Sequence, residues 1–152
     1  MPRSTAGGRA FYAYNVGGFE VRNLNFLGSG AATNASEGVL VYTDLPKNRK
    51  LEHVYFDRVD ISGFGIVGLW VCSNNGQTGY RDVRVTYAES HDNGQDGMYT
   101  SAAWYGTSTE LAHQDVYVGH SRFYNNTDIP GRNNGKGQLR GVQSKDYSAL
   151  QP

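Results

Sequence analysis

One eight-residue pattern returns four times in this chain. Each copy has two apolar residues one apart, then two polar or small residues, then two more apolar or small residues one apart. The copies begin at Phe19, Val54, Val83 and Val116, so successive copies are 35, 29 and 33 residues apart. Self-similarity at such a period indicates structural units that stack, because one unit alone cannot bury its own apolar face.

Each unit is expected to consist of short strands. The apolar positions alternate with period 2, which predicts strands rather than helices. The two central residues of each copy predict a bend or bulge between one short strand and the next. A second alternation follows each copy after a glycine turn: residues 63–71 align with residues 92–100, and residues 37–41 are the corresponding strand of the first unit. Variable polar loops come next, at residues 43–50, 72–79 and 101–112.

Equivalent strands of successive units should lie next to each other, because they recur in the same order with similar connections. This predicts an all-β chain whose parallel sheets are wound into a solenoid, a β-helix. An antiparallel sandwich is the alternative, since it also has many short strands with regular turns. The solenoid is favoured because hairpins would not need the same pattern four times.

The pattern predicts one domain with irregular ends. Residues 1–13 are interpreted as a lead-in or the remnant of an earlier coil, residues 14–137 as the repeats, and residues 138–152 as an irregular C-terminal tail. From residue 138 onward the expected apolar alternation is lost, and we find no amphipathic cap for the last coil, which terminal repeats normally need. We therefore expect a fragment of a longer solenoid, with further coils missing or the reading frame altered near residue 138.

Composition excludes several functional classes. The formal net charge is zero, which argues against a nucleic-acid partner held by a basic face. No apolar run approaches 18 residues, so a membrane span is not expected. Residues 1–8 lack the apolar core of a secretion signal. Cys72 is the single cysteine, so no disulfide can form within the chain, and we interpret this residue as a small buried hydrophobe.

The repeats resemble a known family. Residues 54–71 and 83–100, together with residues 115–126, are similar to the coils of right-handed parallel β-helix proteins in the pectate-lyase-like superfamily. The resemblance covers about residues 14–137 and implies a right-handed, single-stranded parallel β-helix of about four coils. It also implies an extracellular or cell-surface location and a polysaccharide partner. The superfamily includes polysaccharide lyases, glycoside hydrolases and adhesin-like stalks, so the resemblance is specific for fold rather than for activity.

In such a fold, outward residues of successive coils form columns with a spacing of about 4.8 Å. Tyrosine rings in a column can pack on the apolar faces of sugar rings, and arginine can bind hydroxyl or uronate groups. Alternatively, these polar columns only stabilise the stack of strands. Two columns supply the candidate substrate-binding residues, namely Tyr55, Arg84 and Tyr117 in one and Arg58, Tyr87 and His120 in the other.

A third outward column supplies the candidate catalytic residues Asp60, Glu89 and Arg122. Neighbouring carboxylates in it would be about 5 Å apart, as in retaining glycosidases, but every adjacent pair of a column has that spacing. The family resemblance implies bound calcium if the chain is a lyase. Asp57, Asp60 and Glu89 offer three oxygen ligands, fewer than the six to eight that calcium takes. An arginine base would need strong help from its surroundings to lose its proton.

Residues 91–97 and Gly119-His120 show a weaker similarity to the motifs of polygalacturonases. The similarity is incomplete, because Gln95-Asp96 offers one carboxylate where that family has two adjacent ones, and Ser121 replaces a glycine. We interpret His91 and Asp96 as turn residues. The histidines of the chain occupy different registers, which argues against a metal cluster built from them.

Three functional hypotheses follow. The first is an extracellular domain that binds or cleaves polysaccharide by a lyase or glycoside hydrolase reaction. The second is a structural or adhesive solenoid without catalytic activity. The third is an inactive fragment that binds nothing specific.

Overall fold

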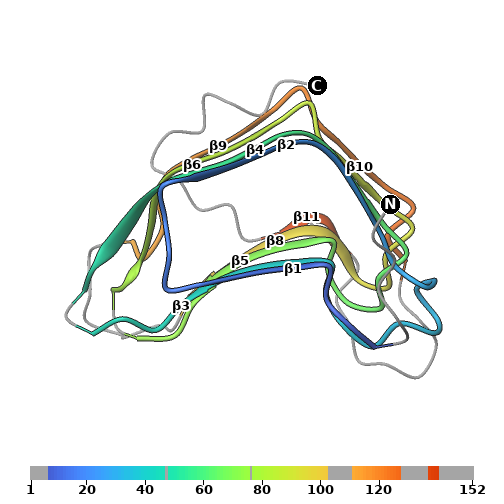
Figure 1. Cartoon of the computed structure of the whole chain (residues 1–152), viewed down its shortest axis with the longest axis horizontal. Coiled ribbons are helices and arrows are strands. Elements are labelled where there is room, and N and C mark those ends of the chain that lie inside the picture. The colour runs from blue at the N-terminus through green and yellow to red at the C-terminus, as the bar shows by residue number, and fades with distance from the viewer. Residues whose placement is uncertain (1–6, 47, 76, 103–110, 128–136, 141–152) are drawn as a thin grey trace.

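The structure is a computed structural model that describes residues 7–46, 48–75, 77–102, 111–127 and 137–140 (Figure 1). In these residues the chain is all-β and contains no helix, so it also has no helix long and apolar enough to cross a bilayer. The strands are β1 (Phe11–Tyr14), β2 (Phe19–Leu27), β3 (Val39–Thr43), β4 (Lys50–Ser62), β5 (Leu69–Ser73), β6 (Gly79–Thr86), β7 (Glu89–His91), β8 (Asp96–Ala102), β9 (Gln114–Gly119), β10 (Arg122–Tyr124) and β11 (Gly137–Arg140).

The strands form two parallel sheets that face each other across the core (Figure 1). Sheet A contains β2, β4, β6, β7, β9 and β10, and sheet B has the order β1-β3-β5-β8-β11. The chain alternates between the sheets and forms a parallel β-solenoid of about three turns. This confirms the solenoid and excludes the sandwich, whose hairpins would pair antiparallel. The expected right-handed winding and the expected count of about four coils stay predictions.

The register of sheet A is the one that the repeat spacing predicts. Phe19 pairs with Val54, Val54 with Val83, and Val83 with Val116, so the four copies lie directly on one another. In sheet B, Leu69 pairs with Met98, the same shift of 29 residues that aligns the two glycine-led segments. The alternation of apolar residues thus determines which side chains enter the core.

The predicted bend lies at one left-handed residue in each layer of sheet A. Asn23, Arg58, Tyr87 and His120 have φ angles of 54°, 52°, 51° and 52°. This conformation is unfavourable for residues with a β-carbon, although asparagine and histidine tolerate it better than arginine and tyrosine. β2 and β4 run through the bend as single strands, whereas later layers divide there into β6 and β7, and into β9 and β10.

The core lies between the sheets and is filled from both. Sheet A contributes Val54, Phe56, Val59 and Ile61 from β4, all at most 2% exposed, and their counterparts in other layers are mostly buried. Leu24 is an exception, because it shares the register of Val59 but is 48% exposed. β2 has a strand partner on one side only among the described residues, so part of its inward face meets solvent.

The ends of the repeat differ from the prediction. β11 pairs with β8, with Leu139 opposite Met98 and Arg140 opposite Tyr99, so the register continues past residue 138, where we expected it to be lost. Backbone pairing can continue there because it does not require an apolar side chain at each position. β1 is already a full strand of sheet B, and the boundary expected between residues 13 and 14 falls inside it. Residues 141–152 of the predicted tail lie outside the described residues.

Candidate functional site

The outer face of sheet A carries all the candidate site residues. Before the bend, Tyr55, Arg84 and Tyr117 occupy one column in the predicted order. Tyr55 Oη donates a 2.6 Å hydrogen bond to Asp82, and Arg84 Nε donates one of 2.8 Å to the same carboxylate. Both hydrogen bonds lower the pKa of Asp82, and the bond from Tyr55 has the larger effect. The same bond raises the pKa of Tyr55. Asp82 therefore holds both candidate ligand-binding side chains in place.

The ring of Tyr55 has further contacts. The guanidinium of Arg84 lies 5.0 Å from its centroid, and the ring of His53 lies 4.1 Å away at a tilt of 38°. His53 Nε2 is 2.9 Å from Glu20 Oε1 in the layer below. Arg22 donates a hydrogen bond of 2.7 Å to the other oxygen of Glu20, and this bond is the main reason that the pKa of Glu20 is lowered. Ion pairs and ring contacts thus link three successive layers before the bend.

The left-handed residues of the bend form a second column. The guanidinium of Arg58 lies 5.2 Å from the centroid of Tyr87, and the rings of Tyr87 and His120 stack at 4.9 Å and 10°. Tyr87 is 52% exposed, yet its ring lies between the layers of Arg58 and His120. It therefore offers its edge and hydroxyl to a ligand rather than an open ring face.

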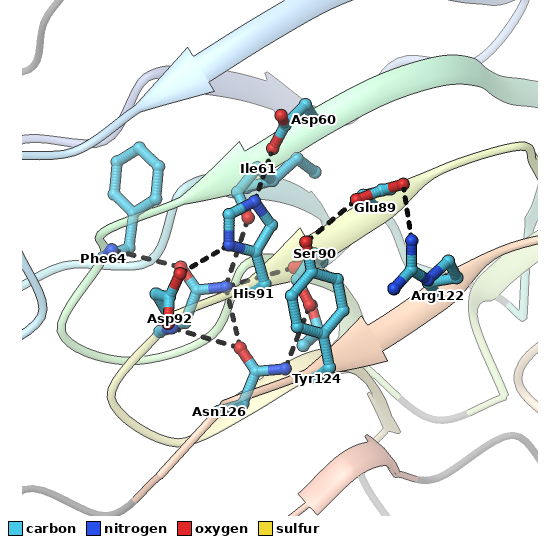
Figure 2. Close-up of polar contacts among 12 residues, drawn as sticks. Asp60, Ile61, Phe64, Glu89, Ser90, His91, Asp92, Arg122, Tyr124 and Asn126 are labelled. Atoms are coloured by element: carbon cyan, nitrogen blue, oxygen red, sulfur yellow. Dashed lines mark hydrogen bonds and ion pairs between the residues drawn. The ribbon is translucent and has the colours of Figure 1, made fainter.

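After the bend, the outer face is centred on His91 (Figure 2). His91 Nε2 lies 3.1 Å from Asp60 Oδ1, and Nδ1 lies 2.6 Å from Asp92 Oδ2. The His91 ring stacks on Tyr124 at 4.7 Å and 5°. We expected His91 and Asp96 in a turn, but they lie at the end of β7 and the start of β8, because the turn is confined to the four residues between these strands.

Glu89 is the second carboxylate of this group. Tyr124 Oη donates a 2.9 Å hydrogen bond to Glu89 Oε2, and Arg122 Nη1 donates a longer one of 3.5 Å to Oε1 (Figure 2). The bond to Glu89 raises the pKa of Tyr124. Because Arg122 is 71% exposed, its pairing with Glu89 is a weak surface contact. Of the three candidate catalytic residues, Asp60 is held by His91, whereas Glu89 and Arg122 contact each other.

A shallow pocket of about 500 Å³ adjoins the His91 group. It is lined by residues 27–30, Ser62, Gly63 and Asp92. Ser62 pairs with His91 in the sheet, and Asp92 belongs to both the pocket and the His91 group. A ligand in the pocket would therefore meet a carboxylate and lie close to an imidazole, which are groups that can bind hydroxyls and transfer protons.

Buried amides fix the turn that carries Asp92. Asn93 Nδ2 donates hydrogen bonds to Asn126 Oδ1 at 3.0 Å and to Ser90 Oγ at 3.1 Å, and Asn126 Nδ2 donates to the Ser90 carbonyl at 3.0 Å. Asn93 Oδ1 accepts a 3.1 Å bond from the Phe64 backbone (Figure 2). A sequence signal exists, because Asn93 and Asn126 are 33 residues apart, the spacing of their two layers.

The described residues do not fit a calcium site of the kind that a lyase would need. No group of three or more His, Cys, Asp or Glu side chains among them is placed to hold a metal ion. Asp57 does not join Asp60 and Glu89, because it accepts a 2.8 Å hydrogen bond from Thr86 Oγ1 and another from Arg58 at the bend.

Sequence reasoning missed the contact between His91 and Tyr124. Leu27, Ser62, His91 and Tyr124 share one register, two residues beyond the column of Asp60 and Glu89. Extending the columns by this one position would have placed His91 and Tyr124 side by side.

Comparison of the chain with protein-family models, curated proteins and solved structures gives no match.

Proposed function

We propose that this chain is an extracellular β-helix domain that binds polysaccharide, of the kind found in the pectate-lyase-like superfamily. The ligand would lie across the layers of sheet A, over the Tyr55, Arg84 and Tyr117 column and the adjacent bend. Guanidinium, imidazole and phenol groups recur there at the strand spacing, which suits a chain of repeating hydroxyl or uronate groups.

The exposed ring of Tyr117 is the observation that carries this proposal. Tyr55 and Tyr87 are engaged by neighbouring rings and guanidinium groups, as described above. Tyr117 is 38% exposed, and no ring or guanidinium among the described residues stacks on it. It lies against the backbone of Gly119, where an added β-carbon would come within 2.6 Å of Tyr117 Cζ. Tyr117 is therefore the tyrosine of its column with most surface left for a sugar ring.

Affinity electrophoresis through gels that contain uronate-rich or neutral polysaccharide tests this proposal. Tyr117→Ala should weaken retention by about 2- to 10-fold, the range expected for loss of one aromatic contact. Arg84→Ala should weaken retention most on the uronate-rich gel. Tyr12→Ala is the control, because Tyr12 is 49% exposed but belongs to sheet B. Unchanged retention in both the Tyr117 and Arg84 variants would exclude this face.

Polysaccharide cleavage is a second candidate function, favoured by the Asp60, His91 and Asp92 group beside the pocket. A lyase would produce unsaturated ends that absorb ultraviolet light, and a hydrolase would release reducing ends only. Asp60→Asn should abolish either product while binding at Tyr117 persists. Asp115→Asn is the matched control, since Asp115 is also a solvent-accessible carboxylate of sheet A but lies before the bend. Binding without either product would indicate a domain that only binds polysaccharide. The absence of both binding and products would favour a structural or adhesive solenoid.

A further inference from the structure

We propose that His113 is a pH-sensitive latch. As a neutral imidazole it holds residues 111–113, which lead into β9, against β6 and the end of β8, and its protonation in acid releases them. The inference does not depend on the polysaccharide function, because none of the candidate site residues takes part in the contacts of His113.

Both ring nitrogens of His113 contact backbone groups. Nδ1 accepts a 3.2 Å hydrogen bond from the backbone N–H of Tyr80, and Nε2 lies 2.9 Å from the carbonyl oxygen of Ser101. Because an amide N–H can only donate and a carbonyl oxygen can only accept, the ring carries its proton on Nε2 and none on Nδ1. One neutral tautomer of the imidazole therefore satisfies both bonds.

These two bonds lie just before the regular pairing of β9 begins. Gln114 is the first residue of β9, and the pairing register places β9 beside β6 from Gln114 opposite Arg81. One residue earlier on each strand, the N–H of Tyr80 donates to the His113 ring. Because Ser101 belongs to β8 of sheet B, this single ring joins strands of both sheets. Release of the ring would therefore loosen the start of β9.

The environment of the ring favours the uncharged imidazole. His113 is 8% exposed, and its ring stacks on that of Tyr80 at 6.0 Å and 14°. Burial is the main reason that the pKa of His113 is lowered. The hydrogen bond to Ser101 acts in the opposite direction, and the ammonium group of Lys50 lowers this pKa further. Burial also raises the pKa of Tyr80, so this neighbour stays an uncharged phenol.

Lys50 of β4 contacts the same segment. Its Nζ donates hydrogen bonds to the carbonyl oxygens of Leu111 at 2.9 Å and of Ala112 at 2.8 Å. Gly79 allows this segment to approach closely, because a β-carbon there would clash with the Ala112 carbonyl oxygen. Side chains of a lysine and a histidine thus hold the three residues before β9.

No carboxylate among the described residues pairs with His113. Arg81 of β6 pairs with Glu52 at 3.0 Å, Asp115 of β9 is exposed, and the contact from β8 is an uncharged carbonyl. A second proton on the ring would therefore create a buried positive charge near the Lys50 ammonium, which costs free energy. It would also direct Nδ1–H at a backbone N–H, so that two donors face each other without an acceptor.

The direction of the pH dependence follows from this difference. Because the pKa of His113 is lowered in the closed form, the open form takes up the second proton more readily. The closed form is therefore fully favoured above the ordinary histidine pKa of about 6.5, and its advantage is lost as pH falls from there toward the lower pKa of the closed form. Within this window each pH unit raises the opening constant by up to about tenfold.

NMR measurement of amide hydrogen exchange in the full chain between pH 7 and pH 5 tests the proposal. The N–H of Tyr80 is the probe, with its exchange rate corrected for the intrinsic pH dependence of exchange. Its protection factor should fall by about 10- to 30-fold between these pH values, because the open form takes up a proton. The N–H of Val71, on the central strand β5 of sheet B, should keep its protection factor, because the release is local.

Two variants separate the latch from a general loss of stability in acid. His113→Gln retains an amide oxygen and an amide N–H for the same two partners but cannot titrate, so the Tyr80 protection factor should change less than about twofold over this pH range. His120→Asn removes an exposed histidine and introduces the residue type that Asn23 provides at the same bend position. The fall in this control should match that of the wild type.

The nitrogen chemical shifts of the His113 ring provide a readout that needs no variant. At pH 7 they should show a proton on Nε2 and none on Nδ1, and protonation of Nδ1 should accompany the loss of Tyr80 protection. A Tyr80 protection factor that is constant between pH 7 and pH 5 would overturn the proposal. So would a fall of wild-type size in His113→Gln, or a doubly protonated ring in a chain that keeps Tyr80 protected.

Discussion

The outer faces of the two sheets are built on the same repeat but have different chemistry. Sheet A carries arginines, histidines and carboxylates that pair from layer to layer. The outer face of sheet B has no formally charged residue in its two described columns from β1 to β8, which consist of Tyr12, Leu40, Trp70 and Tyr99 and of Tyr14, Tyr42, Cys72 and Ser101.

Aromatic stacking links the layers of sheet B. The rings of Trp70 and Tyr99 stack at 5.5 Å and 28°, and Trp70 Nε1 donates a 2.8 Å hydrogen bond to Ser101 Oγ. Tyr14 and Tyr42 stack at 5.7 Å and 14°. Leu40 is only 7% exposed although it lies on the outer face, between Tyr12 and Trp70 of the neighbouring strands.

The difference shows what a parallel solenoid permits. Each side chain lies about 4.8 Å from the equivalent side chain of the next layer, a distance at which uncharged rings stack and like charges repel. A charged face must therefore mix opposite signs, and its contacts depend on pH and salt. An aromatic face stabilises the fold by packing. We expect ligand binding on sheet A and a larger share of the outer-face stabilisation on sheet B.

The largest expected effect concerns Cys72, on the outer face of sheet B. Burial, with a contribution from Glu37, raises the pKa of this thiol to about 12. At pH 8 the folded chain should react with a thiol reagent about 10³-fold more slowly than an unfolded one, because the thiolate is the reactive form. Labelling with and without denaturant measures this ratio. Fast labelling of the folded chain would show that sheet B is not packed as described.

Truncation of Trp70 should be the next largest effect. Trp70→Ala removes a half-buried ring and its stacking on Tyr99, so the free energy of unfolding should fall by about 2–3 kcal/mol. Arg84→Ala, on the outer face of sheet A, should cost less than about 1 kcal/mol, because the Arg84 side chain is 55% exposed to solvent. Urea unfolding of both variants checks the order. Equal losses of unfolding free energy in the two variants would contradict the expected difference between the outer faces of the two sheets.

The smallest effect concerns acid stability. The pKa of Asp82 is lowered in the folded chain, so its stabilising contribution is present above the ordinary carboxylate pKa and is lost as pH falls through the folded value. Asp82→Asn should lower the melting temperature at pH 6 and flatten its fall below about pH 4. Asp115→Asn is the control, because Asp115 occupies the same register position one layer further on. If the melting temperature of Asp82→Asn falls with pH as steeply as that of the wild type, this role of Asp82 is contradicted.

The sequence predicted the framework of the fold well. The repeat spacing placed Val54, Val83 and Val116 in register, and the two central residues of each copy identified the bend. The prediction was wrong where the exposure or the strand register of a residue depends on neighbours outside its own repeat. Leu24 follows the inward pattern, but the pattern does not show that β2 is an edge, and the register past residue 138 depends on backbone pairing with β8.

The candidate site was predicted as columns but not as contacts. Asp60, Glu89 and Arg122 share a column as expected, yet Asp60 contacts His91, which belongs to a different column. Membership of a column shows only that a side chain points outward. The rotamer of that side chain then determines which neighbour, along or across the strands, it contacts.

By itself, the sequence determined the repeat, the parallel register and which residues face outward, because period-2 alternation and fixed spacing leave few other ways to bury the apolar positions. Only the tertiary structure decided which outward groups meet. It showed Arg58 and His120 against the ring of Tyr87, whereas no ring or guanidinium among the described residues stacks on Tyr117. These contacts arise between layers and at the last strand of a stack, which a pattern within one repeat does not encode.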